Sequence, residues 1–242
     1  MKAVYRTVMP YCLDNSVTGV AEEKKKLYEK SDPWGGISQS KRDCVRDELL
    51  KMFEGECAFC GKRLYSKNAD TQVDHFLPKG DFKFLSLCWE NLILLCSDCN
   101  NIKRDFVPQS LKGKIFVEQF MSETTNIPSG ANEYDKKQVF DKCDDRLIDP
   151  SFDDPSKHIC FVPGSHLFMP LTSIGEVMVD RIFRRLRSLN ERLEKLSKLV
   201  KLIIENDQPE QVLEFHISLS GYSFFMKEFY RYWLMLKKTR YK

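Results

Sequence analysis

Two pairs of cysteines, each with the spacing Cys-x-x-Cys, constrain this sequence more than any other feature. The first pair is Cys57 and Cys60, and the second is Cys96 and Cys99. Each pair can place two thiolates on one tetrahedral ion, so together they predict a zinc site. Four thiolates leave no open coordination position, and the zinc would therefore support the fold rather than catalyse a reaction. The alternative interpretation is four ordinary buried thiols.

The composition is that of an ordered protein. The chain has 242 residues, of which 42% are hydrophobic and 12% aromatic, enough to form a core. It contains no apolar run of membrane-spanning length and begins without the pattern of a signal peptide, so we expect a cytoplasmic protein with no membrane partner. In a reducing compartment the cysteines outside the two pairs are expected to be buried free thiols, namely Cys12, Cys44, Cys88, Cys143 and Cys160.

Helical patterns lie on both sides of the cysteine pairs. An apolar stripe from Ser38 to Phe53 predicts a helix that Ser38 or Ser40 caps. Apolar residues three and four apart from Ile182 to Ile203 predict one long helix. We favour packing of this helix within the chain, and packing against another chain is the alternative. A final helix is expected over residues 222–238, with its aromatic residues in the core.

Other stretches of the sequence predict loops and short strands. Residues 1–37 carry turn signals and predict an irregular arm in which we see no chemistry. The polar stretch from Ser122 to Asp135 predicts a linker, and Ile159 to Val162 predicts an edge strand among prolines.

Charge is distributed unevenly along the chain. The formal net charge is only +3, but Lys and Arg outnumber Asp and Glu by two to one from Arg181 to Lys242. A basic region of this kind suits nucleic acid. A solvated helix face is an equally favoured interpretation.

Between the two cysteine pairs lies a dipeptide that can carry out acid–base and metal chemistry. Asp74 and His75 stand near the end of an expected strand that Pro78 stops. A neutral imidazole can take a proton from water near neutral pH, and a neighbouring carboxylate can hold a metal against a phosphate. Because adjacent residues on a strand point to opposite faces, the two can serve one phosphate only if the backbone bends there. In another setting the pair would be an ordinary surface carboxylate beside a histidine.

Residues 57–103 resemble the HNH endonuclease family, whose motif combines C-x-x-C, D-H-x-x-P, N-L and L-C-x-x-C-[HN]-x-x-K. By this resemblance His75 is the general base, Asn91 braces the loop, and Asn100 stands where the family has its final His or Asn. Asp74 and Asn100 would hold a catalytic ion, and the Asn makes that site richer in oxygen, which favours Mg²⁺ or Mn²⁺.

Two lysines near the motif, Lys79 and Lys103, are candidates for phosphate contact. A solvated charge is the equal alternative for each.

The resemblance implies an α+β fold that is predominantly helical. Its centre would be a ββα-metal HNH module with the four-cysteine zinc site, preceded by an N-terminal helix and followed by a helical C-terminal region. In terms of domains we expect an arm at 1–37, the nuclease module at 38–110, a loop-rich connector at 111–170 and a helical, partner-docking region at 171–242.

Further motifs look like those of a subgroup of HNH proteins from bacterial anti-phage systems, the PtuB-like nuclease subunits of Septu and related retron systems. They include Arg146 to Pro150, Asp153 to Pro155 and the expected long helix with Arg187 and Asn190. This resemblance implies an ABC-type, PtuA-like ATPase as partner, in Septu or in a retron complex, with the C-terminal helices as docking surface. The substrate would be a nucleic acid, and DNA and RNA both stay open.

Two other functions stay open as well. A zinc-ribbon nucleic-acid-binding or adaptor protein without catalysis would explain the cysteines and the basic region, but not Asp74 and His75 together with Asn91 and Asn100. A free-standing restriction nuclease would need a module that reads bases, and the sequence has no recognisable one, which favours recruitment by a partner.

Overall fold

The computed structural model describes residues 1–112 and 136–240, and the linker predicted from Ser122 to Asp135 lies outside them. Within these described residues the protein is α+β, with about half of them in helices and two small two-stranded sheets. The longer elements are α1 (Val20–Glu29), α2 (Pro33–Gly36), α3 (Gln39–Met52), β1 (Thr71–His75), β2 (Leu92–Cys96), α4 (Ser97–Lys103), α6 (Lys136–Phe140), β3 (Ile159–Val162), β4 (Leu167–Pro170), α7 (Ser173–Met178), a π-helical turn η5 (Val179–Phe183), α8 (Arg187–Glu205), α9 (Glu210–Ser220) and α10 (Ser223–Arg240). Short 3-10 helices are η1 (Lys83–Leu85), η2 (Trp89–Asn91), η3 (Gln109–Leu111) and η4 (Pro155–Lys157).

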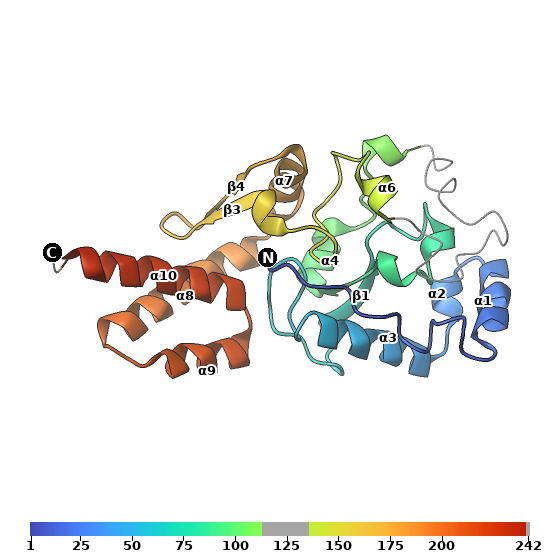
Figure 1. Cartoon of the computed structure of the whole chain (residues 1–242), viewed down its shortest axis with the longest axis horizontal. Helices are drawn as coiled ribbons and strands as arrows, with labels where there is room; N and C mark the ends of the chain where they lie inside the picture. Colours follow the sequence, from blue (N-terminus) through green and yellow to red (C-terminus); the bar gives the residue numbers. More distant parts are fainter. Residues whose placement is uncertain (113–135, 241–242) are drawn as a thin grey trace.

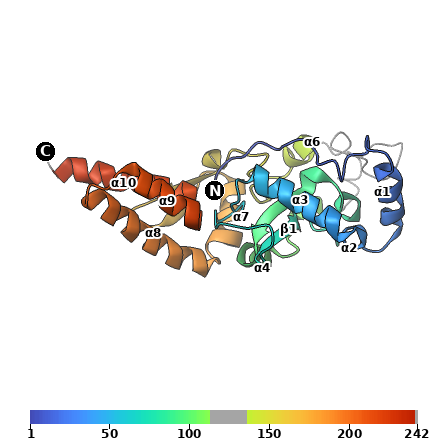
Figure 2. The same ribbon diagram turned by 90° about the horizontal axis from the view of Figure 1, so that it is seen from below.

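The elements follow one another along an elongated molecule. Helices α8, α9 and α10 gather at one end, α1 and α2 lie at the other, and β1 and α4 lie between them (Figure 1). The view from below shows the same order (Figure 2). Within the described ranges, no helix combines the length and apolar character needed to cross a membrane.

Helix α3 forms where the sequence predicts it. The Ser38 hydroxyl accepts a hydrogen bond from the backbone N–H of Lys41 at 3.4 Å and so caps the helix. Its apolar stripe is buried, and the helix packs against both β1 and β2. The chain then turns at Gly55, whose φ of 67° suits a glycine.

Strands β1 and β2 form an antiparallel pair that runs from Thr71 opposite Cys96 to His75 opposite Leu92. Strand β2 is buried throughout, and α4 follows it directly and packs back onto both strands. The expected end of the strand before Pro78 is confirmed. The bend expected at Asp74 and His75 is not found there, because the ladder stays regular through His75 and the backbone bends only at Phe76 and Leu77.

The C-terminal helical region differs from the prediction in one respect. The expected single helix from Ile182 to Ile203 is wrong, because η5 and a break at residues 184–186 precede α8. In η5 the N–H of Arg184 bonds to the carbonyl of Val179 at 2.9 Å, five residues back, and Leu186 then leaves helical geometry with ψ 73°. The expected packing within the chain is confirmed, since the apolar stripe of α8 is buried where α8 meets α10.

The cysteines outside the two pairs also require a correction. Cys12 and Cys44 form a disulfide that joins the N-terminal arm to α3, and Cys160 is exposed. Only Cys88 and Cys143 are the expected buried free thiols. Spacing could not reveal the disulfide because 32 positions separate its cysteines. Disulfides are uncommon in a reducing compartment, so this pair does not follow from the expectation of a cytoplasmic protein.

The first cysteine pair is docked onto the C-terminal helices. Glu56 accepts hydrogen bonds from the backbone N–H of Ser223 at 3.2 Å and from its hydroxyl at 2.8 Å, at the start of α10. The N–H of Arg63 donates to the carbonyl of Ser220 at 3.2 Å. Gly221 between them has φ 74°, and a Cβ there would lie 2.6 Å from the Arg63 nitrogen. The loop of the first cysteine pair therefore needs glycine at this position.

Candidate functional site

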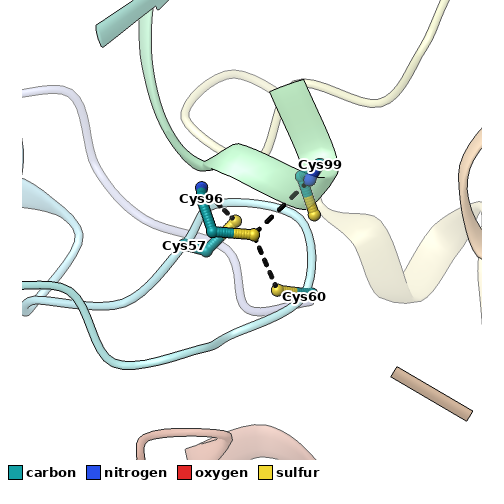
Figure 3. A group of neighbouring side chains, drawn as sticks. All are labelled: Cys57, Cys60, Cys96 and Cys99. Carbon is teal, nitrogen blue, oxygen red and sulfur yellow. Dashed lines mark hydrogen bonds between the residues drawn. The ribbon is translucent and has the colours of Figure 1, made fainter. Parts of the chain in front are cut away.

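The four cysteines of the two pairs come together in one buried cluster (Figure 3). Their sulfur atoms all lie within 4.8 Å of one another, and Cys60 Sγ is 3.7 Å from Cys96 Sγ. Zinc bound to four thiolates at about 2.3 Å would set its sulfurs about 3.8 Å apart, so the cluster fits that ion. The backbone N–H groups of Cys96 and Cys99 donate to Cys57 Sγ at 3.3 Å and to Cys96 Sγ at 3.5 Å, which would further stabilise thiolates.

The ionisation of Cys57 reflects this crowding. Burial opposes its ionisation, but hydrogen bonds from Cys60, Cys96 and Cys99 outweigh burial and lower the pKa of the Cys57 thiol well below its ordinary value. A thiolate is the form that binds zinc.

His75 lies at the other end of the β1–β2 ladder and is buried, with 5% of its surface exposed. Its Nε2 is 3.0 Å from the carbonyl oxygen of Ser86. A carbonyl only accepts hydrogen bonds, so Nε2 carries the proton and Nδ1 is left as the proton acceptor. The edge of the Trp34 ring packs against the imidazole at 5.4 Å. Burial lowers the pKa of His75, which favours the neutral form that a general base requires.

Asp74 points towards α4 rather than towards the loop that holds His75. Its Oδ2 forms an ion pair with Lys103 Nζ at 2.7 Å. The same Nζ donates to the carbonyl oxygen of His75 at 2.7 Å. The Lys103 side chain is 1% exposed and that of Asp74 is 19% exposed. Lys103 thus ties the end of α4 to both residues of the dipeptide.

Asn100 completes this group from one turn earlier on α4. One terminal atom of its amide is 3.2 Å from each carboxylate oxygen of Asp74, and the other contacts the side chain of Gln72. With its nitrogen towards Asp74 the amide donates to the carboxylate. With its oxygen in that position, Asn100 and Asp74 present oxygens to a common point.

The second orientation fits a divalent cation. Neighbouring oxygen ligands of an octahedral Mg²⁺ with bonds of 2.0 to 2.1 Å lie about 3 Å apart, close to the separation between Asn100 and Asp74. Lys103 engages Oδ2 of Asp74 and leaves Oδ1 for such an ion. These two residues supply oxygen ligands only, which suits Mg²⁺ or Mn²⁺.

Asn91 holds the loop that follows β1. Its Oδ1 accepts a hydrogen bond from the backbone N–H of Leu77 at 2.8 Å, and its Nδ2 donates to the carbonyl oxygens of Leu77 at 2.9 Å and Leu85 at 3.4 Å. Only 1% of Asn91 is exposed. Since Ser86 follows Leu85, these bonds also hold the carbonyl that orients His75.

The two lysines that the sequence suggested for phosphate contact are in different environments. Lys79 is 38% exposed and pairs with Asp32 at 2.5 Å, at the start of α2. The hydrogen bond from Lys79 lowers the pKa of Asp32. Lys103 is buried behind Asp74, so its position favours holding that carboxylate over direct contact with a substrate.

No pattern in the sequence indicated that the N-terminal arm reaches this site. Trp34 packs on His75, and the guanidinium of Arg6 donates to the carbonyl oxygens of Trp89 at 2.7 Å and Leu92 at 3.1 Å. The prediction of an arm without any link to the chemistry therefore missed these contacts. No spacing or periodicity in residues 1–37 could have shown them, because they join positions far apart in the chain.

Asp149, in the downstream motif from Arg146 to Pro150, has a structural part. Asp149 and Lys136 form a fully buried ion pair, and Lys136 also donates to the carbonyl oxygen of Glu90 at 2.7 Å, beside Asn91. Burial opposes ionisation of Asp149, but the charges of Lys136 and Arg6 and the hydrogen bonds from Lys136 and Ser151 together outweigh burial and lower the pKa of the carboxyl to about 2. Lys136 and Asp149 thus anchor their part of the chain beside Asn91, the residue that holds the loop after β1.

Comparisons with known proteins match the part of the chain that carries this site. Residues 57–106 match the family model described as HNH endonuclease, so the chain contains an HNH domain. The chain is similar to two curated proteins named Septu protein PtuB. One, from Bacillus mycoides (strain KBAB4), is 24% identical over 58% of this chain and 46% of its own length. The other, from Bacillus thuringiensis, is 25% identical over 60% of this chain and 43% of its own length.

The match to both relatives is partial. The chain spans less than half the length of either. No solved structure matches it significantly.

Proposed function

We propose that this chain is a metal-dependent endonuclease that hydrolyses phosphodiester bonds of nucleic acid at the His75 site. One observation carries the proposal: within the segment that matches the HNH model, a buried histidine has Nε2 held by a carbonyl and Nδ1 left as acceptor, next to the oxygen pair of Asp74 and Asn100.

In the proposed reaction Nδ1 of His75 accepts a proton from the attacking water. Asp74 and Asn100 would hold Mg²⁺ or Mn²⁺, which would supply Lewis-acid stabilisation of the charge on the phosphorane and on the departing 3′ oxygen. Lys103 positions Asp74 and the backbone of His75. Asn91 keeps the loop in the shape that orients the imidazole.

The four cysteines have a structural part in the proposal. They would bind zinc with no open position, at the point where β2 meets α4. In this ββα-metal module a bound zinc would keep α4 against the strands, and α4 carries Asn100 and Lys103 to Asp74.

Similarity to Septu protein PtuB supports a place for this nuclease in a bacterial anti-phage system with a PtuA-like, ABC-type ATPase. Residues 38–110 would be the nuclease module, 111–170 the connector and 171–242 the docking region. Exposed apolar residues on α9, Phe215 at 60% and Leu219 at 58%, suit a docking surface. The relatives' names refer to Septu, and a retron complex stays a prediction.

The test is cleavage by the purified, zinc-loaded chain, alone and with the ATPase encoded beside it. Plasmid DNA and total RNA would be incubated with Mg²⁺ or Mn²⁺. We expect metal-dependent cleavage by the wild type and a loss of about 10²- to 10⁴-fold in His75→Ala, with zinc content and melting temperature retained. Undiminished cleavage by His75→Ala would overturn the assignment of the base. No cleavage under any condition by a folded, zinc-loaded protein would favour the binding or adaptor function.

A further inference from the structure

A cavity of about 330 Å³ lies between the end of α4 and the π-helical turn η5. It is at the small end of the range for ligand sites. Its lining includes apolar residues, among them Phe106, and most of the charged residues in the lining are basic. The charged residues that line it are Lys103, Arg104, Asp105, Arg181 and Arg185.

The π-helical turn and the break that follows it bring two of these arginines to the end of α4. Ile182 and Phe183 are buried in the core and anchor η5 by its apolar side, while Arg181 in η5 and Arg185 just after it are exposed. The guanidinium of Arg181 lies over the Phe106 ring, 5.2 Å from its centre. This contact holds Arg181 at the cavity wall.

Arg181 and Arg185 are free to bind an anion. In the described part of the chain neither forms an ion pair, although Asp105 is nearby. Their neighbour Arg184 differs, because it pairs with Asp180 at 2.5 Å and does not line the cavity. The Nε of Arg104 is already used by the carbonyl of Asn101 at 3.2 Å. Two guanidinium groups at one cavity wall match the oxygens of a phosphate.

The cavity adjoins the proposed nuclease site. Lys103 lines it and pairs with Asp74 at 2.7 Å, so the same residue contacts both the cavity and the carboxylate. We propose that this cavity binds a backbone phosphate of the nucleic acid next to the phosphate that is cleaved. This inference rests on the proposed function for the substrate class. In this proposal η5 and the start of the basic C-terminal region help to bind the nucleic-acid strand.

The test measures binding apart from cleavage. The zinc-loaded full chain, without added Mg²⁺ or Mn²⁺, would be titrated into fluorescent oligothymidylate and oligouridylate at several KCl concentrations. For Arg181→Gln/Arg185→Gln we expect about tenfold weaker binding, and the slope of log K against log salt should fall by about 0.7, the value for one phosphate contact on a single strand. The matched control, Arg184→Gln, should bind as the wild type does. Tighter binding of one oligonucleotide would show whether the site prefers DNA or RNA.

A second variant separates charge from geometry. Arg181→Lys/Arg185→Lys keeps both charges, so the salt slope should return to the wild-type value. Circular dichroism would verify that each variant is folded. An unchanged slope in the Gln variant, or an equal loss in Arg184→Gln, would overturn the phosphate site.

The two proposals can fail separately. If the wild type cleaves but the Gln variant binds and cleaves like it, only the phosphate site is wrong. If the wild type never cleaves, yet the Gln variant alone loses binding, the phosphate site stands and the nuclease proposal is wrong.

Discussion

The two ends of the β1–β2 ladder carry opposite kinds of site. At the Thr71–Cys96 end four buried sulfurs converge, whereas near the His75–Leu92 end the His75 imidazole is held by the loop and the Asp74 carboxylate contacts the Asn100 amide on α4. Helix α4 begins at the first site and ends at the second. A complete set of sulfur ligands stabilises a fold, whereas an incomplete set of oxygen ligands beside a neutral histidine leaves room for a substrate.

The small module thus keeps its structural site, the cysteine cluster, apart from the site proposed for the reaction. The cysteines are at most 3% exposed, while the Asp74 side chain is 19% exposed. Because α4 links the two ends, substitution of a cysteine should shift α4 and so disturb the site at the His75 end. Substitutions at the His75 end should leave the four cysteines able to bind zinc.

The largest effect is expected from Cys96→Ser, which removes a sulfur ligand at the start of α4. We expect loss of zinc and of cooperative unfolding, because the binding energy of a structural zinc, about 10 to 16 kcal/mol in small zinc peptides, is folding energy. Elemental analysis and thermal melting followed by circular dichroism would measure both. Cys143→Ser is the control, since Cys143 is buried but lies outside the cluster. A zinc-free Cys96→Ser protein that melts like the wild type would refute the structural role.

A smaller effect is expected from Lys103→Met, which acts at the other end of α4. It leaves the carboxylate of Asp74 without its partner and removes the bond to the His75 carbonyl. We expect a loss of about 2 kcal/mol in the free energy of unfolding, reduced cleavage and unchanged zinc content. Lys79→Met is the matched control, because its ion pair is partly exposed and contributes less than about 1 kcal/mol. Equal losses in the two variants would contradict a positioning role for Lys103.

The smallest effect concerns pH. Burial lowers the pKa of His75, so the imidazole stays neutral to a lower pH than a free histidine. Cleavage should therefore persist as pH falls and decline only below about 6.5, where His75 becomes protonated. The pH profile of kcat/KM measures this. An acidic limb above 6.5 would show that another group, or a charged His75, controls the reaction.

Local signals in the sequence were sufficient for much of this molecule. The Ser38 cap and the apolar stripe predicted α3, and the Cys-x-x-Cys spacing predicted four sulfurs that the structure brings together. Periodicity also predicted α8 and its packing within the chain, but it placed the start of the helix at Ile182, whereas α8 begins at Arg187. It could not detect η5, because a π-helical turn shifts the stripe by one residue without breaking its apolar character.

The sequence by itself determined which chemical groups are present and in what local order: two thiol pairs, an Asp-His dipeptide and an amide one turn into a helix. Only the tertiary structure decided their partners. It placed Trp34 on His75, Lys103 on Asp74 and Arg181 beside the end of α4. Spacing reports on neighbours within one helix or strand, whereas these contacts depend on how separate elements pack, which burial of the whole apolar core controls.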